Sequence, residues 1–373
     1  MQTPTGSFRN RFYPDVTDAE WDDWHWQLQQ AVRDRAALER FLTLSEDEVA
    51  FFDRAEKPFP VSIPPHYLGL MHLGDGSDPL RLAMVPRQQE HVTHPGERLD
   101  PLGETDHNPV SRIVHTYPHK VLFLVTDFCA TYCRYCTRAR SVGSGDWPTL
   151  ERDWQEALDY IRMHPEIKDV LISGGDPLTL SDARLDMLLS ALRSIPHVEL
   201  IRIGTKLPAV LPQRITPELV AMLASHGPLW LSVHYTHVRE LHPAARAACD
   251  RLANAGIPMM SQTVLLKGVN DSVEAIRELN ETLLLCRVKP YYLHMCDPIV
   301  GSDHFKVPLS VGQDIIRGLH GHCTGYAVPM LMIDAPGGGG KVPVGPHYIE
   351  GREDDRLVLK NYVGDRYFYH DPL

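Results

Sequence analysis

Residues 120–137 read KVLFLVTDFCATYCRYCT and decide the fold class. The stretch begins with an apolar run of strand length, and Cys129, Cys133 and Cys136 follow directly behind it. Six more apolar runs of similar length come later, separated by helical patterns: KDVLIS, VELIRIGT, LWLSVH, PMMSQTVLL, KPYYLHM and YAVPMLMID. Because strands that alternate with helices pair in parallel through crossover connections, this order predicts an α/β fold built on a parallel sheet.

Composition favours a globular enzyme that acts on small molecules. The 373 residues are 43% hydrophobic with a formal net charge of -11, which disfavours nucleic acid or an anionic membrane surface as the main partner. The polar N-terminal segment lacks a signal-peptide core, and no stretch is apolar for long enough to cross a bilayer, so we expect a cytoplasmic protein. We expect a helical N-terminal region at 1–110, a barrel at 111–345 and a charged, aromatic tail at 346–373.

Polar residues follow the ends of the predicted strands. The cysteines follow the first run and a Gly-Gly-Asp turn at 174–176 follows the second, while His234, Asp297 and Asp334 lie at the ends of later runs. In parallel barrels, reactive groups gather where strands end and loops begin. We therefore expect these residues to surround one mouth of the barrel.

The three cysteines have the spacing C-x3-C-x2-C, so one loop offers three thiolates. Soft thiolates hold iron-sulfur clusters, and a four-iron cluster with three protein ligands keeps one iron open for the amino and carboxylate groups of a substrate or cofactor. The alternatives are a loop of buried cysteines or a zinc site without its fourth ligand. Zinc sites usually pair C-x2-C with a second, distant pair, and the sequence has none, so we favour a 4Fe-4S cluster.

A second element, DAPGGGGKVP at residues 334–343, places a lysine amine behind four glycines. Val342 follows Lys341, so the serine or threonine that a P-loop needs after its lysine is missing. With little side-chain bulk around it, Lys341 can form a Schiff base with a carbonyl cofactor. A flexible glycine loop with a solvated lysine is the alternative that these residues leave open.

The cysteine motif resembles the signature of the radical S-adenosylmethionine (SAM) superfamily, C-x3-C-x-aromatic-C, with Tyr135 as the aromatic residue. The resemblance implies a partial (β/α)6 barrel that holds a 4Fe-4S cluster on the three cysteines. It also implies that Gly174, Gly175 and Asp176 form the turn beside the methionyl amino group of SAM. Glycines let the backbone approach a ligand and a carboxylate accepts hydrogen bonds from an ammonium, although Gly-Gly-Asp-Pro alone is equally a plain turn.

With the glycine-rich element added, the chain resembles the lysine 2,3-aminomutase family from its tryptophan-rich N-terminal segment to about Tyr348. The resemblance implies a role for each residue at a matching position: Lys341 as the Schiff-base lysine of pyridoxal phosphate (PLP), Lys120 near the cofactor phosphate, Arg138 for the substrate carboxylate, Asp297 and Asp334 for a distal ammonium, and His234 and Gln262 in the SAM site. Singly, Asp334 could cap the glycine turn, Asp297 could belong to an Asp-Pro turn, and Arg138 could be a solvated surface residue. Their joint occurrence at strand ends favours the functional interpretation.

Three departures from the family pattern affect these expectations. Lys120 stands where the family has an arginine, and lysine still binds phosphate, as a point charge. Ser272 replaces a cysteine of the family's zinc site and no cysteine follows Cys323, so we do not expect structural zinc. His294 stands where a tyrosine is expected, which can alter the choice of substrate.

The resemblance implies an isomerase, a PLP-dependent amino-acid 2,3-aminomutase that moves an α-amino group to the β carbon. L-Lysine is the first choice of substrate, because two carboxylates at the side-chain end favour a cation. L-Arginine is the alternative, glutamate is disfavoured, and a radical SAM and PLP enzyme acting on another amine or on a protein lysine stays open. The resemblance further implies an electron donor such as flavodoxin or ferredoxin, and a homo-oligomer.

Overall fold

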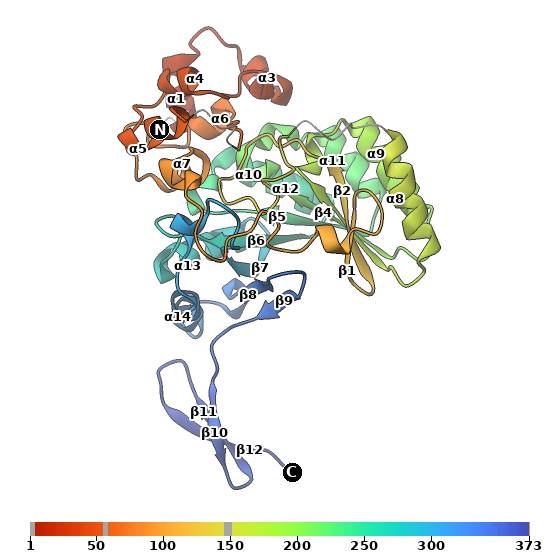
Figure 1. Cartoon of the computed structure of the whole chain (residues 1–373), viewed down its shortest axis with the longest axis vertical. Coiled ribbons are helices and arrows are strands. Elements are labelled where there is room, and N and C mark those ends of the chain that lie inside the picture. The colour runs from red at the N-terminus through yellow and green to blue at the C-terminus, as the bar shows by residue number, and fades with distance from the viewer. Residues whose placement is uncertain (1–3, 55–58, 145–150, 373) are drawn as a thin grey trace.

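The computed structural model of the chain describes residues 4–54, 59–144 and 151–372, and its centre is a barrel-like sheet (Figure 1). Its strands pair in the order of the sequence. They are β1 (Ile113–Tyr117), β2 (Lys120–Thr126), β3 (Asp169–Gly174), β4 (Leu200–Thr205), β5 (Leu229–His234), β6 (Met259–Leu265), β7 (Val288–Met295), β8 (Met330–Ala335) and β9 (Gly340–Pro343). All pairs from β2 to β8 are parallel, whereas β1 and β9 pair antiparallel at the two edges.

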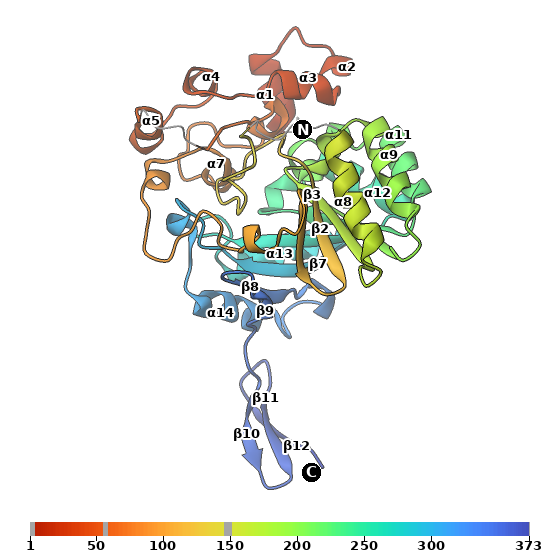
Figure 2. The same ribbon diagram turned by 45° about the vertical axis from the view of Figure 1, so that its right-hand side comes forward.

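Helices connect the parallel strands and cover the outside of the sheet (Figures 1 and 2). They are α8 (Glu151–Met163), α9 (Asp182–Arg193), α10 (Leu207–Val210), α11 (Pro217–Ser225), α12 (Pro243–Asn254), α13 (Val273–Leu285) and α14 (Leu309–Leu319). Six helical crossovers join β2 to β8, as the (β/α)6 expectation requires. The predicted α/β class and parallel pairing are therefore confirmed.

Alternation along each strand separates the core from the barrel interior. In β4, Ile201 and Ile203 are buried in the main hydrophobic core, while Arg202 and Gly204 line a central cavity. The same division holds in β3, β5 and β6, because successive side chains of a strand point to opposite faces. The apolar runs thus pack outward against the helices and leave every second position free for chemistry.

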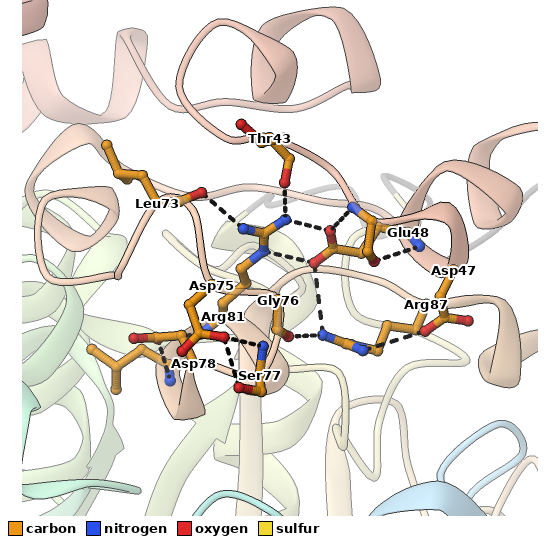
Figure 3. A network of polar contacts seen from close by, with 12 residues as sticks. Thr43, Asp47, Glu48, Leu73, Asp75, Gly76, Ser77, Asp78, Arg81 and Arg87 are labelled. Atoms are coloured by element: carbon orange, nitrogen blue, oxygen red, sulfur yellow. Dashed lines mark hydrogen bonds and ion pairs between the residues drawn. The ribbon is translucent and has the colours of Figure 1, made fainter.

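The N-terminal region is helical, as expected, and lies on one side of the barrel (Figure 1). Its helices are α1 (Pro4–Phe12), α2 (Asp18–Trp21), α3 (Trp24–Gln29), α4 (Arg35–Glu39), α5 (Glu46–Phe52), α6 (Pro65–Leu68) and α7 (Pro79–Met84). Ser45 and Glu48 form a capping box that satisfies backbone donors at the start of α5. Figure 3 shows that Glu48 also pairs with Arg81 of α7, so one carboxylate both begins a helix and joins it to another.

The C-terminal tail contains a three-stranded antiparallel sheet that the sequence pattern did not reveal. Its strands, β10 (Ile349–Glu353), β11 (Arg356–Lys360) and β12 (Arg366–His370), project away from the barrel (Figures 1 and 2). Val358 is the buried apolar residue of this sheet, while Tyr367, Phe368 and Tyr369 are exposed. Nowhere in the described part of the chain does a helix have the length and apolar character that crossing a bilayer requires.

Candidate active site

A cavity of about 570 Å³ runs through the barrel and collects many of the predicted site residues. Those lining it are Lys120, Arg138, His234, Gln262, Asp297, Asp334 and Lys341. The three cysteines, Tyr135, Gly174, Gly175 and Asp176 are not among the lining residues and occupy the loops beside one end of the barrel. The structure thus gathers the residues predicted for PLP and substrate, together with His234 and Gln262, around one space.

The cysteine loop leaves the end of β2 and is held by the end of β3. The backbone N–H groups of Gly175 and Asp176 donate to the carbonyl oxygens of Thr126 and Phe128, respectively. A Cβ on Gly174 would collide with the carbonyl oxygen of Thr126, and a Cβ on Gly175 with that of Phe128. These two glycines are therefore needed for the close approach of the two segments.

All seven cysteines of the chain are free, and the three in the loop are half-buried. Burial is the main cause of their raised pKa values, about 11 for Cys136, where the neighbouring Cys133 adds to the effect. Three such thiols in one loop are stable as thiolates only when positive charge compensates them, as the irons of a cluster do. No group of three or more His, Cys, Asp or Glu side chains in the described residues is arranged to hold a single metal ion.

Arg134 anchors the cysteine loop to the N-terminal region. Its guanidinium donates to both carboxylate oxygens of Glu90 and to the carbonyl oxygens of Phe59 and Pro60, and its backbone N–H donates to the carbonyl oxygen of Ala83. The Arg134 side chain is fully buried. The N-terminal helices therefore fix the loop in place, a role that the sequence did not indicate.

The side chain of Asp176 is occupied by neighbouring groups. It accepts hydrogen bonds from the Thr205 hydroxyl and from the backbone N–H groups of Leu178 and Lys206, at 2.7 to 3.1 Å. Burial raises its pKa to about 6. These contacts fix the turn at 174–176 against the end of β4, and a contact to a SAM ammonium would use the remaining lone pairs of the carboxylate.

His234 and Gln262 are neighbours on β5 and β6, where their Cα atoms are register partners. Both side chains line the cavity. Burial, with the nearby charge of Lys206, lowers the pKa of His234 to about 3, so its imidazole is neutral. The pair offers uncharged hydrogen-bonding groups, which suit a ligand such as a nucleoside better than an ion.

Arg138 is held by Glu104, a residue that the sequence did not single out. Nε and Nη2 of Arg138 donate to the Glu104 carboxylate at 2.7 to 3.2 Å, while Nη1 lies 3.4 Å from the Ser173 hydroxyl. Arg140 pairs with the same carboxylate at 3.2 Å. Nη1 is thus the nitrogen left for a substrate carboxylate. A bidentate contact would require Glu104 to give up one of its hydrogen bonds with the guanidinium.

Asp334 and Lys341 face each other across the hairpin that the glycine-rich element forms. They are register partners in the antiparallel pair β8 and β9, and Nζ of Lys341 lies 2.8 Å from both carboxylate oxygens. Nδ1 of His294 lies 3.2 Å from the same carboxylate. Burial acts to raise the pKa of Asp334, but the hydrogen bond from His294 and the charge of Lys341 outweigh it and lower the pKa to about 2.

Asp297 follows the end of β7 and has the opposite electrostatic character. Burial and then repulsion from Asp334 raise the pKa of Asp297 to about 7. No cation pairs with this carboxylate among the described residues, although it lines the cavity. A cationic ligand would relieve this repulsion.

The opposite end of the cavity is positive. Lys120 begins β2, with its Nζ 4.0 Å from the Tyr117 ring centroid, and Arg202 lies nearby on β4, paired with Asp169 at 2.8 Å. Burial and then repulsion from Arg202 lower the pKa of Lys120. This excess of positive charge fits the phosphate of PLP, and Lys341 supplies an amine that faces the same cavity.

Two family models match the chain: the Radical SAM superfamily matches residues 123–279, and Lysine-2,3-aminomutase matches residues 316–373. The L-lysine 2,3-aminomutase of Fusobacterium nucleatum subsp. nucleatum is 45% identical over 99% of this chain and 87% of that protein. The chain belongs to the lysine 2,3-aminomutase family. It is 43% identical to the L-lysine 2,3-aminomutase of Clostridium subterminale, over 98% of this chain and 88% of that protein. It is 38% identical to the glutamate 2,3-aminomutase of Clostridioides difficile, over 93% of this chain and 82% of that protein.

Membership of the lysine 2,3-aminomutase family makes the chain a radical SAM aminomutase, and hence an isomerase. Such an enzyme acts on a small molecule and requires SAM, an iron-sulfur cluster and a reductant. The relatives include both lysine and glutamate aminomutases, so the substrate has to be argued from the site itself.

Several residues of the site were not found from the sequence. Glu104 lies 34 residues from Arg138 in the chain, and nothing in its local pattern marks it. Lys206, which pairs with the fully buried Glu240 at 2.8 Å, directly follows the end of β4, so the rule that reactive groups follow strand ends would have found it. Tyr117, whose hydroxyl accepts from the Lys341 backbone N–H at 2.7 Å, lies in an edge strand that the sequence analysis missed.

Proposed function

We propose that the chain is a PLP-dependent L-lysine 2,3-aminomutase, which moves the α-amino group of L-lysine to the β carbon. The observation that supports this most is the presence of Asp297 and Asp334 on one cavity that also contains Lys341 and Arg138. Two buried carboxylates destabilise each other unless a cation joins them. The Asp297 carboxyl, with its raised pKa, has the room and the electrostatic need for the distal ammonium of lysine.

When bound, the cluster and SAM would supply one-electron radical chemistry, and PLP would supply a conjugated π system for the amino group. The residues of the chain bind and orient. The three cysteines hold the cluster, Lys341 provides the amine for the PLP carbonyl, and Lys120 attracts its phosphate. Arg138 binds the substrate carboxylate while Asp297 and Asp334 hold the far end of the side chain, so the β carbon is fixed between the two anchors.

The carboxylates of Asp297 and Asp334 also bear on the alternative substrates. A guanidinium satisfies two carboxylates as well as an ammonium does, so L-arginine is the second candidate. A glutamate side chain would bring a third carboxylate to Asp297 and Asp334. In the described structure Lys341 is the cation on that pair, since burial lowers the pKa of His294, the other basic side chain beside Asp334, and keeps it neutral. Glutamate is therefore disfavoured although one relative uses it.

The test uses anaerobically purified enzyme reconstituted with iron, sulfide and PLP, and supplied with SAM and a reductant. L-Lysine, L-arginine and L-glutamate are offered separately, and α- and β-amino acids are resolved by mass spectrometry. A β-amino acid from L-lysine supports the proposal. A product from L-arginine or L-glutamate alone would show that this amino acid, and not L-lysine, is the substrate. Cleavage of SAM without isomerisation of any of them would overturn the proposed reaction.

Binding of L-lysine is expected to weaken as the pH falls below about 7. The pKa of Asp297 lies near 7 in the free protein, so at lower pH the cation must first displace a proton from this carboxyl. The dissociation constant should rise by up to about tenfold per pH unit below that value and level off above it. Asp334, with a pKa of about 2, stays ionised and adds no slope.

The measurement is a titration of PLP-loaded enzyme with L-lysine, followed by the visible absorption of the cofactor from about pH 6 to about pH 8. Asp297→Asn is the control, since it should bind more weakly with no pH dependence from this group. An equal slope in the wild type and in Asp297→Asn would show that another group titrates.

The remaining expectations are part of the same proposal. The seven free cysteines support a reducing compartment such as the cytoplasm. The exposed aromatic residues of β12 support a homo-oligomer that covers them, and flavodoxin or ferredoxin is the proposed electron donor. We also retain the division into an N-terminal region at 1–110, a barrel at 111–345 and a tail at 346–373.

A further inference from the structure

His294 lies on the inner face of β7. Its strand neighbours Leu293 and Met295 are buried in the core cluster that packs against α13 and α14, so the His294 side chain points the other way, into the barrel. The imidazole lines the central cavity and is 6% exposed.

One ring nitrogen of His294 has a partner, and that contact fixes the tautomer. Nδ1 lies 3.2 Å from the carboxylate of Asp334, which is ionised and can only accept a hydrogen bond, so Nδ1 carries the proton. Burial is the largest effect on the imidazole and lowers the pKa of His294 below its usual value. The ring is therefore neutral, and Nε2 presents a lone pair.

The second ring nitrogen, Nε2, is buried and has no hydrogen-bond partner among the described residues. Leaving a buried acceptor unpaired costs about 1–3 kcal/mol, so such atoms normally find a partner when the protein is in its working state. Asp334 is itself engaged by Nδ1 and by Lys341. The missing partner of Nε2 therefore has to come from the cavity that the ring lines.

We infer that Nε2 of His294 accepts a hydrogen bond from the distal ammonium of the substrate, as a third acceptor beside Asp297 and Asp334. This inference rests on the proposed function. An ammonium has three N–H donors that point in three directions, and three separate acceptors on one cavity match that number. A guanidinium has its five N–H donors in one plane, which suits pairs of carboxylate oxygens, so His294 favours lysine over arginine.

The test compares binding of L-lysine, L-norleucine and L-arginine to PLP-loaded enzyme without reductant, followed by the visible absorption of the cofactor. L-Norleucine has the chain length of lysine and lacks the distal amine, so it reports on cavity shape alone. In His294→Phe, the dissociation constant for L-lysine should rise about 10-fold or more, as expected for a hydrogen bond to a charged group. L-Norleucine should bind His294→Phe as it binds the wild type.

His294→Gln is the conservative variant, because an amide can donate to Asp334 and accept from the ammonium at once. It should recover most of the affinity for L-lysine and of the preference over L-arginine. The inference is overturned if L-lysine and L-norleucine weaken equally in His294→Phe, because His294 then acts through packing, or if neither changes, because His294 then takes no part in binding. If the wild-type enzyme itself shows no preference for L-lysine over L-norleucine, the result contradicts the proposed function, in which the substrate is a cationic amino acid.

Discussion

Replacing Lys341 by arginine is expected to abolish aminomutase activity, by at least about 10³-fold, while the fold and the ion pair with Asp334 survive. A guanidinium keeps the positive charge beside the carboxylate, but it stays protonated and cannot form a Schiff base. Lys341→Met should be equally inactive, and because it removes the cation, the pKa of Asp334 should rise towards its ordinary value. The two variants therefore separate the charge of the lysine from its nucleophilicity.

The measurement is turnover together with the visible absorption of bound PLP after gel filtration. Lys168→Arg, at a surface ion pair with Glu199, is the matched control and should retain both. Schiff-base absorption or turnover in Lys341→Arg would assign the cofactor amine to another residue.

Removing the buried carboxylate of Glu48 is expected to destabilise the N-terminal region by about 3–5 kcal/mol. Glu48 and Arg81 are both fully buried, and Nε of Arg81 donates to Glu48 at 2.7 Å (Figure 3). Glu48→Gln leaves the guanidinium with carbonyl partners at Thr43 and Leu73 but without a counter-charge. An uncompensated buried charge is far more costly than the loss of an exposed ion pair.

Urea unfolding of the reconstituted enzyme, monitored through its far-ultraviolet circular dichroism, measures this effect. Glu39→Gln, which breaks the exposed pair with Arg35, serves as the comparison and should cost at most about 0.5 kcal/mol. Similar transition midpoints for Glu48→Gln and Glu39→Gln would show that the buried pair adds nothing beyond a surface contact.

The barrel was predictable because its strands carry a buried apolar face, which in β3, β4 and β6 alternates with half-buried positions. LWLSVH coincides with β5, and the other six runs differ from their strands by a few residues at the ends. β1 and β9 were missed because they are short edge strands, and β10 and β12 because all their residues are exposed and give no alternation of burial. Burial thus decides which strands a sequence reveals.

Residue type and spacing led to the site prediction where they carry the chemistry. The cysteine motif and the glycine-lysine element fall in this class, and the structure adds the hairpin that sets Lys341 opposite Asp334, with Gly337, Gly338 and Gly340 at positive φ. Partners brought together by tertiary structure could not be read in this way. Glu104 on Arg138 and Glu90 on Arg134 are separated by 34 and 44 residues, and no local pattern relates them.

The sheet does not close between its two edge strands, β1 and β9, and Lys341 lies at this junction, which we call the seam. β1 and β9 are not ladder partners; the Tyr117 hydroxyl joins them by accepting from the Lys341 backbone N–H, and a second bond runs from the Gly337 N–H to the carbonyl oxygen of Pro101. Parting the seam breaks these few bonds and leaves the parallel ladders intact, so its free-energy cost is that of a local fluctuation rather than of unfolding. The lysine that we propose as the anchor of PLP therefore lies at the edge of the sheet and not between two parallel strands, on the side where the fewest backbone bonds stand between the cavity and a bulky prosthetic group.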